Sequence, residues 1–334
     1  MVHAMTRRSY SWGRSFAAAL VVVLLVVAMR LPRNQHEGPL RVAVGIWPGS
    51  ESLVLAREMG LLPADRFQLM EVTWASAAYR AFDNGVVDAV VLSLDGVLRL
   101  LESGEALRVI YVMDVSKGAD AILVRDEGET TVLDLKGRRV GVDVRGSGMY
   151  LLAAALAPAG LTITDVEIVP LLQPEMEAAF LLGDVNAVVV SEPWMTELRA
   201  KGARVLMDSN AVSPPIYRVL AVTESALQER GDELVELLRA HLAMVPRLQV
   251  GGDEKEMNAI LRREGLTRGK FTAALGRVHH LDVMENRSLL GEQGAGIANI
   301  VSKLDERMDG SENRAHAPLV EDWIDASILE AAGP

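Results

Sequence analysis

Short apolar runs alternate with amphipathic segments along most of the chain. Between residues 40 and 113 this pattern predicts four strands with a helix in each interval. A run that is apolar at every position, such as Ala89-Val-Val-Leu, is typical of a strand covered on both faces of its sheet. The alternation indicates βαβ units and a mainly parallel sheet. The predicted strands are 40–46, 67–74, 87–92 and 106–113, and the predicted helices are 51–59, 75–84 and 95–103.

A second series of strands and helices follows the polar connection at residues 125–131. After Ser213-Pro-Pro-Ile, which has the character of a crossing segment, we expect a strand at 218–222 to rejoin the first lobe. The pattern is helical from residue 232 onward. The second series comprises strands 139–142, 166–169, 187–190 and 204–207 and helices 147–157, 174–182 and 192–201, and the later helices are 233–247, 255–263, 271–276, 297–308 and 320–329.

The fold class that these elements predict is α/β, with two mainly parallel lobes, two crossings and a helical C-terminal tail. The first lobe is expected to comprise residues 37–125 and 215–334, and the second residues 126–214. Two lobes joined in this way leave a cleft between them, and clefts between domains are where small ligands bind.

The first 36 residues have the pattern of a targeting segment. They contain five arginines and no acidic residue, and the uncharged apolar run 16–29 follows the first three of these arginines. Such a run is short for a transmembrane helix and suits the core of a signal peptide. No clean small-residue cleavage site follows it, so an uncleaved membrane anchor and a buried N-terminal helix stay open as alternatives. With a signal or an anchor the rest of the chain is exported, which predicts a periplasmic or extracytoplasmic protein.

Charge and composition exclude several classes of protein. The formal net charge is −11, and beyond residue 36 there are 29 basic residues against 45 acidic ones. A body this acidic repels phosphate backbones, so we expect no nucleic-acid partner. The chain has no cysteine, which excludes a disulfide scaffold and a cysteine-ligated metal. The neighbours His279 and His280 are expected on different faces of a helix, so we predict no metal site.

A glycine-rich turn between a predicted strand and a predicted helix is a candidate binding element. The sequence Arg145-Gly-Ser-Gly-Met opens the helix, and a helix N-terminus presents free N–H groups. The hydroxyl of Ser147 and the amides of Gly148 and Met149 would then hold an acceptor group of a ligand. The alternatives are that the turn serves packing and that Ser147 caps its own helix. The turn lacks the P-loop pattern and is no dinucleotide fingerprint.

Six further segments, in their order and spacing, resemble a known family. The resemblance is to the periplasmic substrate-binding proteins of ABC importers, of the nitrate/sulfonate/taurine and thiamine-precursor (NMT1/SsuA-like) type, and it covers about residues 40–290. It implies a bilobed periplasmic-binding-protein fold (type II) that closes on a small solute and docks on a membrane permease. The segments are Val42-Ala-Val-Gly-Ile-Trp-Pro-Gly, Leu55-Ala-Arg-Glu-Met-Gly-Leu-Leu, Phe82-Asp-Asn-Gly-Val-Val-Asp-Ala, Ser116-Lys-Gly-Ala-Asp-Ala-Ile-Leu-Val, Leu135-Lys-Gly-Arg-Arg-Val-Gly-Val and Val185-Asn-Ala-Val-Val-Val-Ser-Glu-Pro-Trp.

Two tryptophans and two carboxylates are further candidates for the ligand site. The resemblance implies that Trp47 lies over the ligand, where an aromatic ring stacks on planar or cationic groups. Asp120 is expected at a strand near the lobe crossing, and Glu192 at a strand-to-helix junction that faces the same cleft edge, with Trp194 close behind it. This set suits an amine, an amidine or a hydrogen-bonding heterocycle better than a bare anion. The alternatives are that Trp47 packs between lobes, that Asp120 bonds backbone in the hinge and that Glu192 caps its helix.

Ser93 and the second crossing complete the predicted site. Ser93 follows the third strand together with Asp95, where both either line the first lobe or cap the next helix. The family frequently has an aspartate in the second crossing, where this chain has Pro215-Ile-Tyr-Arg. This departure leaves Tyr217 or Arg218 as the local polar group.

The function that we expect is solute binding for an importer, without catalysis and without a cofactor. The partners are a small-molecule solute containing nitrogen or sulfur and an ABC permease, and the protein is expected to be a monomer. A membrane-anchored ligand sensor on the same fold is the first alternative. A thiamine-pyrimidine synthase-like enzyme is the second, but it needs a lysine for pyridoxal phosphate and a reactive histidine. Between Val54 and Lys117 the chain has neither, which counts against that enzyme.

Overall fold

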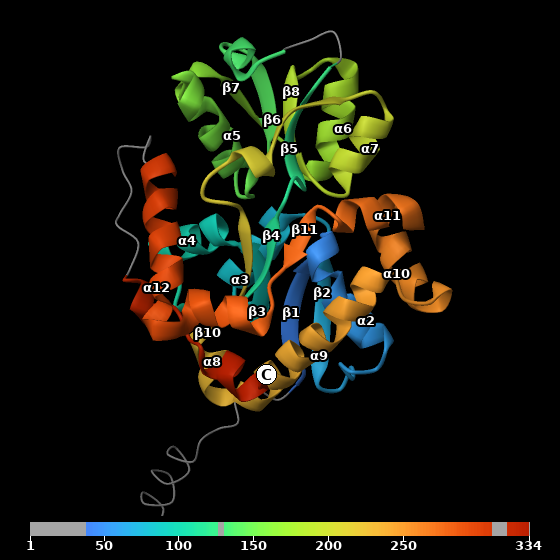
Figure 1. Cartoon of the computed structure of the whole chain (residues 1–334), viewed down its shortest axis with the longest axis vertical. Helices are drawn as coiled ribbons and strands as arrows, with labels where there is room; N and C mark the ends of the chain where they lie inside the picture. Colours follow the sequence, from blue (N-terminus) through green and yellow to red (C-terminus); the bar gives the residue numbers. More distant parts are fainter. Residues whose placement is uncertain (1–37, 126–129, 309–318, 334) are drawn as a thin grey trace, which may run out of the picture. The chain divides into compact units, whose positions relative to one another are not determined.

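Two β-sheets, each flanked by helices, form the described part of the protein (Figure 1). The computed structural model describes residues 38–125, 130–308 and 319–333. Residues 40–334 form a unit separate from residues 1–39, and the following paragraphs concern that larger unit. The predicted targeting segment at residues 1–36 lies outside the described residues. Within them, no helix has both the length and the apolar character that crossing a membrane requires.

The first sheet has six strands in the order β11-β4-β10-β3-β1-β2. β1 pairs in parallel with β2 and β3, whereas β10 lies antiparallel between β3 and β4. All five residues of β3 are buried, as expected for a strand covered on both faces. The strands are β1 Leu40–Gly45, β2 Phe67–Val72, β3 Ala89–Ser93, β4 Leu107–Ser116, β10 Tyr217–Thr223 and β11 Val278–His280.

The second sheet has five strands in the order β7-β6-β8-β5-β9. β6 pairs in parallel with β7 and β8, and β5 lies antiparallel between β8 and β9. The predicted α/β fold with two sheets is confirmed, but both sheets are mixed, because β10 and β11 in the first sheet and β5 in the second pair antiparallel with their neighbours. The strands are β5 Asp120–Val124, β6 Arg139–Val142, β7 Glu167–Pro170, β8 Ala187–Ser191 and β9 Arg204–Asp208.

Helices connect the strands and form the C-terminal part. α9 ends at Gly251 and α10 at Gly265, which have φ of +89° and +67° and so take the left-handed backbone that glycine adopts without strain. The helices are α2 Glu51–Glu58, α3 Ala75–Asp83, α4 Leu94–Glu102, α5 Gly148–Leu156, α6 Gln173–Leu182, α7 Trp194–Ala200, α8 Glu224–Glu229, α9 Gly231–Val250, α10 Glu254–Glu264, α11 Arg268–Leu275, α12 Val283–Met308 and α13 Ser327–Ala332.

The chain crosses between the two sheets twice. β4 ends at Ser116 in the first sheet and β5 begins at Asp120 in the second, so the first crossing lies at residues 117–119. The chain returns between Asp208, where β9 ends, and Tyr217, where β10 begins. β5 therefore belongs to the second sheet, whereas the predicted boundary at residue 125 leaves it in the first lobe. The exact extent of each lobe stays a prediction.

Three predictions for the C-terminal third were wrong. His279 and His280 lie in the short strand β11, not in a helix. Their imidazoles are engaged, since His279 Nε2 lies 2.8 Å from Glu285 Oε1 and His280 Nε2 donates to the carbonyl of Gly49. The predicted helix 297–308 begins already at Val283, and the predicted helix 320–329 is a single 3₁₀ turn followed by α13. A strand of three residues is too short to produce a periodic pattern.

Candidate functional site

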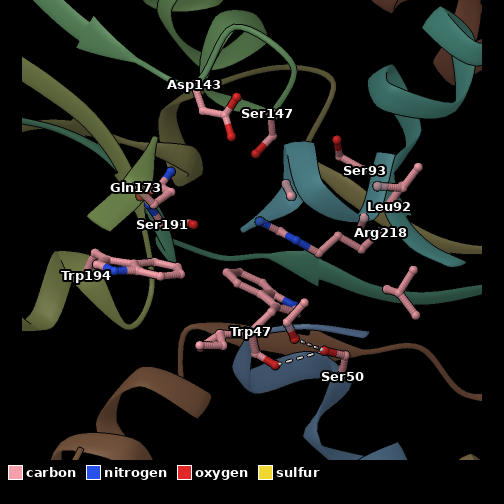
Figure 2. Close-up of a pocket in the computed structure, with 16 residues that line it drawn as sticks. Trp47, Ser50, Leu92, Ser93, Asp143, Ser147, Gln173, Ser191, Trp194 and Arg218 are labelled. Atoms are coloured by element: carbon pink, nitrogen blue, oxygen red, sulfur yellow. Dashed lines mark hydrogen bonds between the residues drawn. The ribbon is translucent and has the colours of Figure 1, made fainter. Parts of the chain in front are cut away.

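A pocket lies between the two sheets, at the carboxyl ends of their parallel strands (Figure 2). Its enclosed volume is about 60 Å³, which suits a small molecule or the polar end of a larger one. We call it the interlobe pocket. Its lining residues come from both sheets and are Gly45, Ile46, Trp47, Ser50, Ala75, Ala78, Val91, Leu92, Ser93, Asp143, Gly146, Ser147, Gln173, Ser191, Trp194 and Arg218.

Trp47 forms one wall of the interlobe pocket, and Arg218 lies against its ring (Figure 2). The guanidinium carbon of Arg218 is 3.3 Å from the ring centroid, a cation–π contact. Trp47 Nε1 donates to Asp114 Oδ2 at 3.0 Å. A β-carbon added to Gly49 would lie only 2.2 Å from that oxygen, so glycine is required for Asp114 and Trp47 to meet.

The charge of Arg218 is already balanced inside the protein. Arg218 Nη2 donates to both carboxylate oxygens of Asp120, at 3.0 and 3.2 Å. Ser147 Oγ donates to the same carboxylate at 3.1 Å. Asp114 is completely buried nearby, and burial raises its pKa to about 6 against the opposing effects of Arg218 and the Trp47 hydrogen bond. At neutral pH this cluster holds two carboxylates for one guanidinium.

Asp143 is a lining residue that the sequence analysis missed. It follows β6 directly, only 4% of its surface is exposed, and its Oδ1 accepts a hydrogen bond from the amide of Arg145 at 3.1 Å. Its Oδ2 has no hydrogen-bond partner among the described residues. β6 ends at Val142, as the predicted strand 139–142 does, so the carboxylate stands directly after the strand end.

Four of the predicted site residues line the interlobe pocket, namely Trp47, Ser93, Ser147 and Trp194. Trp194 and Trp47 lie on neighbouring sides of it (Figure 2). Asp120 lies beside the pocket and holds Arg218.

The other predicted residues lie elsewhere. Gly148 and Met149, in the first turn of α5, do not line the pocket. A β-carbon on Gly148 would lie 2.9 Å from Val142, which gives this glycine a packing role against the sheet. Tyr217 is partly buried at the start of β10 and is absent from the pocket wall as well.

Glu192 lies outside the pocket wall and joins the two sheets. It is completely buried, accepts hydrogen bonds from the amide and hydroxyl of Thr196, and forms an ion pair with Arg277 at 2.9 Å. Arg277 precedes β11 of the first sheet, whereas Glu192 follows β8 of the second. Burial raises the pKa of Glu192, and the bonds from Thr196 and the charge of Arg277 oppose this rise. The helix-capping alternative for Glu192 therefore describes its contacts better than ligand binding does.

The sequence is similar to a known protein family and to a curated relative. A family model described as NMT1-like matches residues 34–262. A protein of Escherichia coli (strain K12) named for aliphatic sulfonate binding is 30% identical over 179 residues, which cover 52% of this chain and 56% of that protein. The chain thus matches little more than half the length of this relative.

Among the described residues, no group of three or more histidines, aspartates and glutamates is arranged to hold a metal ion.

Solved structures share the fold at low sequence identity. The periplasmic aliphatic sulphonate-binding protein SsuA from Escherichia coli superposes with a TM-score of 0.63 at 21% identity, over 84% of this chain and 96% of that one. The desulfurization enzyme DszB superposes with a TM-score of 0.61 at 17% identity, over 89% and 99% of the two chains. The same architecture therefore occurs in a binding protein and in an enzyme, and the fold alone does not decide between them.

Proposed function

The chain belongs to the NMT1-like family, and on that premise we propose that it is the extracytoplasmic solute-binding component of an ABC-type importer. It binds a small organic solute containing nitrogen or sulfur in the interlobe pocket and delivers it to a permease. The observation that carries this proposal is that one pocket is lined by residues of both sheets, beside the two crossings of the chain. Motion about such crossings opens and closes the pocket around a solute.

The chemistry of the pocket wall supports binding over turnover. The lining residues of the described chain offer hydroxyls, an amide, one carboxylate, one guanidinium and two indoles, but no lysine, histidine or cysteine. A serine nucleophile needs an adjacent base. Ser147, which contacts the Asp120 carboxylate, shares it with Arg218, so that carboxylate serves an ion pair.

The remaining parts of the proposal concern location and assembly. The protein acts outside the cytoplasm, exported by residues 1–36, which are either removed or kept as a membrane tether. It works as a monomer and docks on the permease once it is loaded. Size-exclusion chromatography with light scattering tests the monomer, and cell fractionation of the full chain tests export. A cytoplasmic full chain would contradict the proposal.

A thermal-shift screen of the purified full chain tests solute binding. The panel contains small aliphatic sulfonates, carboxylates, amines and aminopyrimidines at neutral pH. A solute present at a hundred times its Kd adds about 2.7 kcal/mol to the free energy of unfolding, which raises the melting temperature measurably. We expect a saturable rise that Trp194→Ala abolishes and that Leu182→Ala, a change at an exposed position of α6, leaves intact. A panel without any saturable shift would contradict the proposal.

A further inference from the structure

From the charges around the interlobe pocket, we infer that the solute carries a protonated nitrogen, an ammonium or an amidinium, and that Asp143 binds it. The inference rests on the proposed solute-binding function and names the class of solute that this pocket selects. It assigns to Asp143 the role of specificity-determining residue.

The guanidinium of Arg218 is already committed to a carboxylate. Its Nη2 is bonded to both oxygens of Asp120, and the group is stacked on Trp47. The buried carboxyl group of Asp114, which accepts the hydrogen bond of Trp47 Nε1, lies beside the same cluster. Arg218 Nη1 is buried and has no hydrogen-bond partner among the described residues, so an acceptor group of the solute can bind there, but it would meet a guanidinium whose charge Asp120 already balances.

The carboxylate of Asp143 is the charged group of the pocket wall that lacks an ionic partner. Its Oδ1 accepts one backbone N–H, while its Oδ2 is buried and has no hydrogen-bond partner among the described residues. A buried ionised oxygen without a donor is costly, and a donor with a positive charge satisfies it best. A solute ammonium or amidinium supplies that donor.

The cationic side chains near Asp143 are engaged with other groups. Arg145 lies over the ring of Tyr79, 5.3 Å from its centroid. Arg99 forms an ion pair with Asp95 at 2.9 Å and donates to the carbonyl of Arg145 at 3.0 Å. The loop that carries Asp143 is thus fixed by Arg99, while the carboxylate stays available to the pocket.

The rest of the pocket suits a small cation. Asp143 and Ser147 lie on one side of it, and the indoles of Trp47 and Trp194 lie on the opposite side (Figure 2). An aromatic face attracts a cation, and the hydroxyls of Ser93 and Ser191 accept further N–H bonds. A protonated nitrogen thus finds partners on several sides, whereas a second anion beside Asp143 would be repelled.

The test compares solutes that differ in one group, using isothermal titration of the unmodified full chain at pH 7. One series is 2-aminoethanesulfonate, 2-hydroxyethanesulfonate and ethanesulfonate; a second is 3-aminopropanoate, 3-hydroxypropanoate and propanoate; a third is ethylamine and ethanol. In each series that binds, we expect the amine to bind at least about tenfold more tightly than the counterparts that carry a hydroxyl group or a hydrogen in place of the ammonium, since it gains a charge-assisted hydrogen bond. This comparison requires no variant.

The variant Asp143→Asn then assigns the effect to one residue. Asparagine keeps an oxygen for the amide of Arg145 but loses the charge, so the preference for the amine should fall about tenfold or more. Asp184→Asn, at an exposed position after α6, is the matched control and should keep that preference. If sulfonates or carboxylates bind with no preference for the amine, or if Asp143→Asn keeps it, the inference is wrong while solute binding stands. If no solute of any series binds, both fall.

Discussion

The Asp114 carboxyl group should make the free energy of unfolding depend on pH. Its pKa is about 6 in the folded protein because burial disfavours the charged form, whereas an unfolded aspartate has a pKa of about 3.9. The folded state therefore holds this proton more tightly than the unfolded state. The stabilisation that results is complete below the unfolded pKa and is lost as pH rises through the folded pKa.

The variant Asp114→Asn should remove this pH dependence. Between pH 4 and pH 7 the wild type should lose roughly 2–3 kcal/mol of unfolding free energy relative to the variant, because asparagine does not ionise. Asparagine keeps an acceptor oxygen for Trp47 Nε1, so the indole stays in place. Urea unfolding across this range measures the difference. Glu51, whose pKa burial raises to about 7, changes stability in the same direction in both proteins and cancels in the comparison.

At the residue scale, sequence reasoning located part of the pocket. Ser93, which ends β3, was predicted because a strand end fixes where its next side chain lies, and Trp47 was predicted from the resemblance to the family. Asp143 was missed although the predicted strand 139–142 coincides with β6, because a strand end alone does not show that a carboxylate oxygen is buried without a partner. Glu192 has the predicted position at a strand end, but its orientation is set by Arg277, some eighty-five residues away, and no local pattern reports such a partner.

At the element scale, two ion pairs connect the segment around α11 to the beginning of α7. Arg277 meets Glu192, which is completely buried, at 2.9 Å. Lys270 meets Glu197 at 2.7 Å, and both of these side chains are about one third exposed. The two pairs join the same elements. If the basic partner is removed, water can solvate the partly exposed Glu197 but not the buried Glu192.

We expect these pairs to differ strongly in what their removal costs. Arg277→Ala leaves a buried carboxylate with only the donors of Thr196, which should lower the free energy of unfolding by roughly 2–4 kcal/mol. Lys270→Ala removes a solvent-screened pair and should cost less than about 1 kcal/mol. Urea denaturation at pH 7 measures both. Equal losses would show that the burial of Glu192 does not determine the strength of its pair.

The strands and helices could be predicted from the sequence where the hydrophobic pattern extends over many residues. The βαβ alternation from Leu40 to Asp208 follows from apolar runs of four or more residues separated by amphipathic helices. Sequence reasoning missed β11, which exists because Val278 pairs with Ser116 of β4, the short helix α8 and the first half of α12. A short strand at a sheet edge depends on a partner distant in sequence, so its own residues carry little signal.

At the scale of the whole molecule, contacts between the sheets hold the interlobe pocket in the conformation described here. Glu192–Arg277 and Glu197–Lys270 join the two sheets on one side, and Arg218–Asp120 joins them beside the crossings. Arg99 adds a contact from α4 to the loop that carries Asp143. We therefore expect the solute-free protein to populate closed forms, and a solute to shift the balance between open and closed forms.

This view predicts how the free protein responds when one connection is lost. Removing Arg277 takes away a contact that exists only when the sheets are close, so Arg277→Ala should populate open forms and enlarge the radius of gyration in small-angle scattering. Lys270→Ala, which removes a weaker contact between the same elements, should change it much less. A saturating solute from the thermal-shift panel contacts both sheets and should return Arg277→Ala to the wild-type radius. An unchanged radius in the free variant would mean that the ion pair of Arg277 with Glu192 is not needed to keep the sheets close, and that the crossings and the remaining contacts suffice.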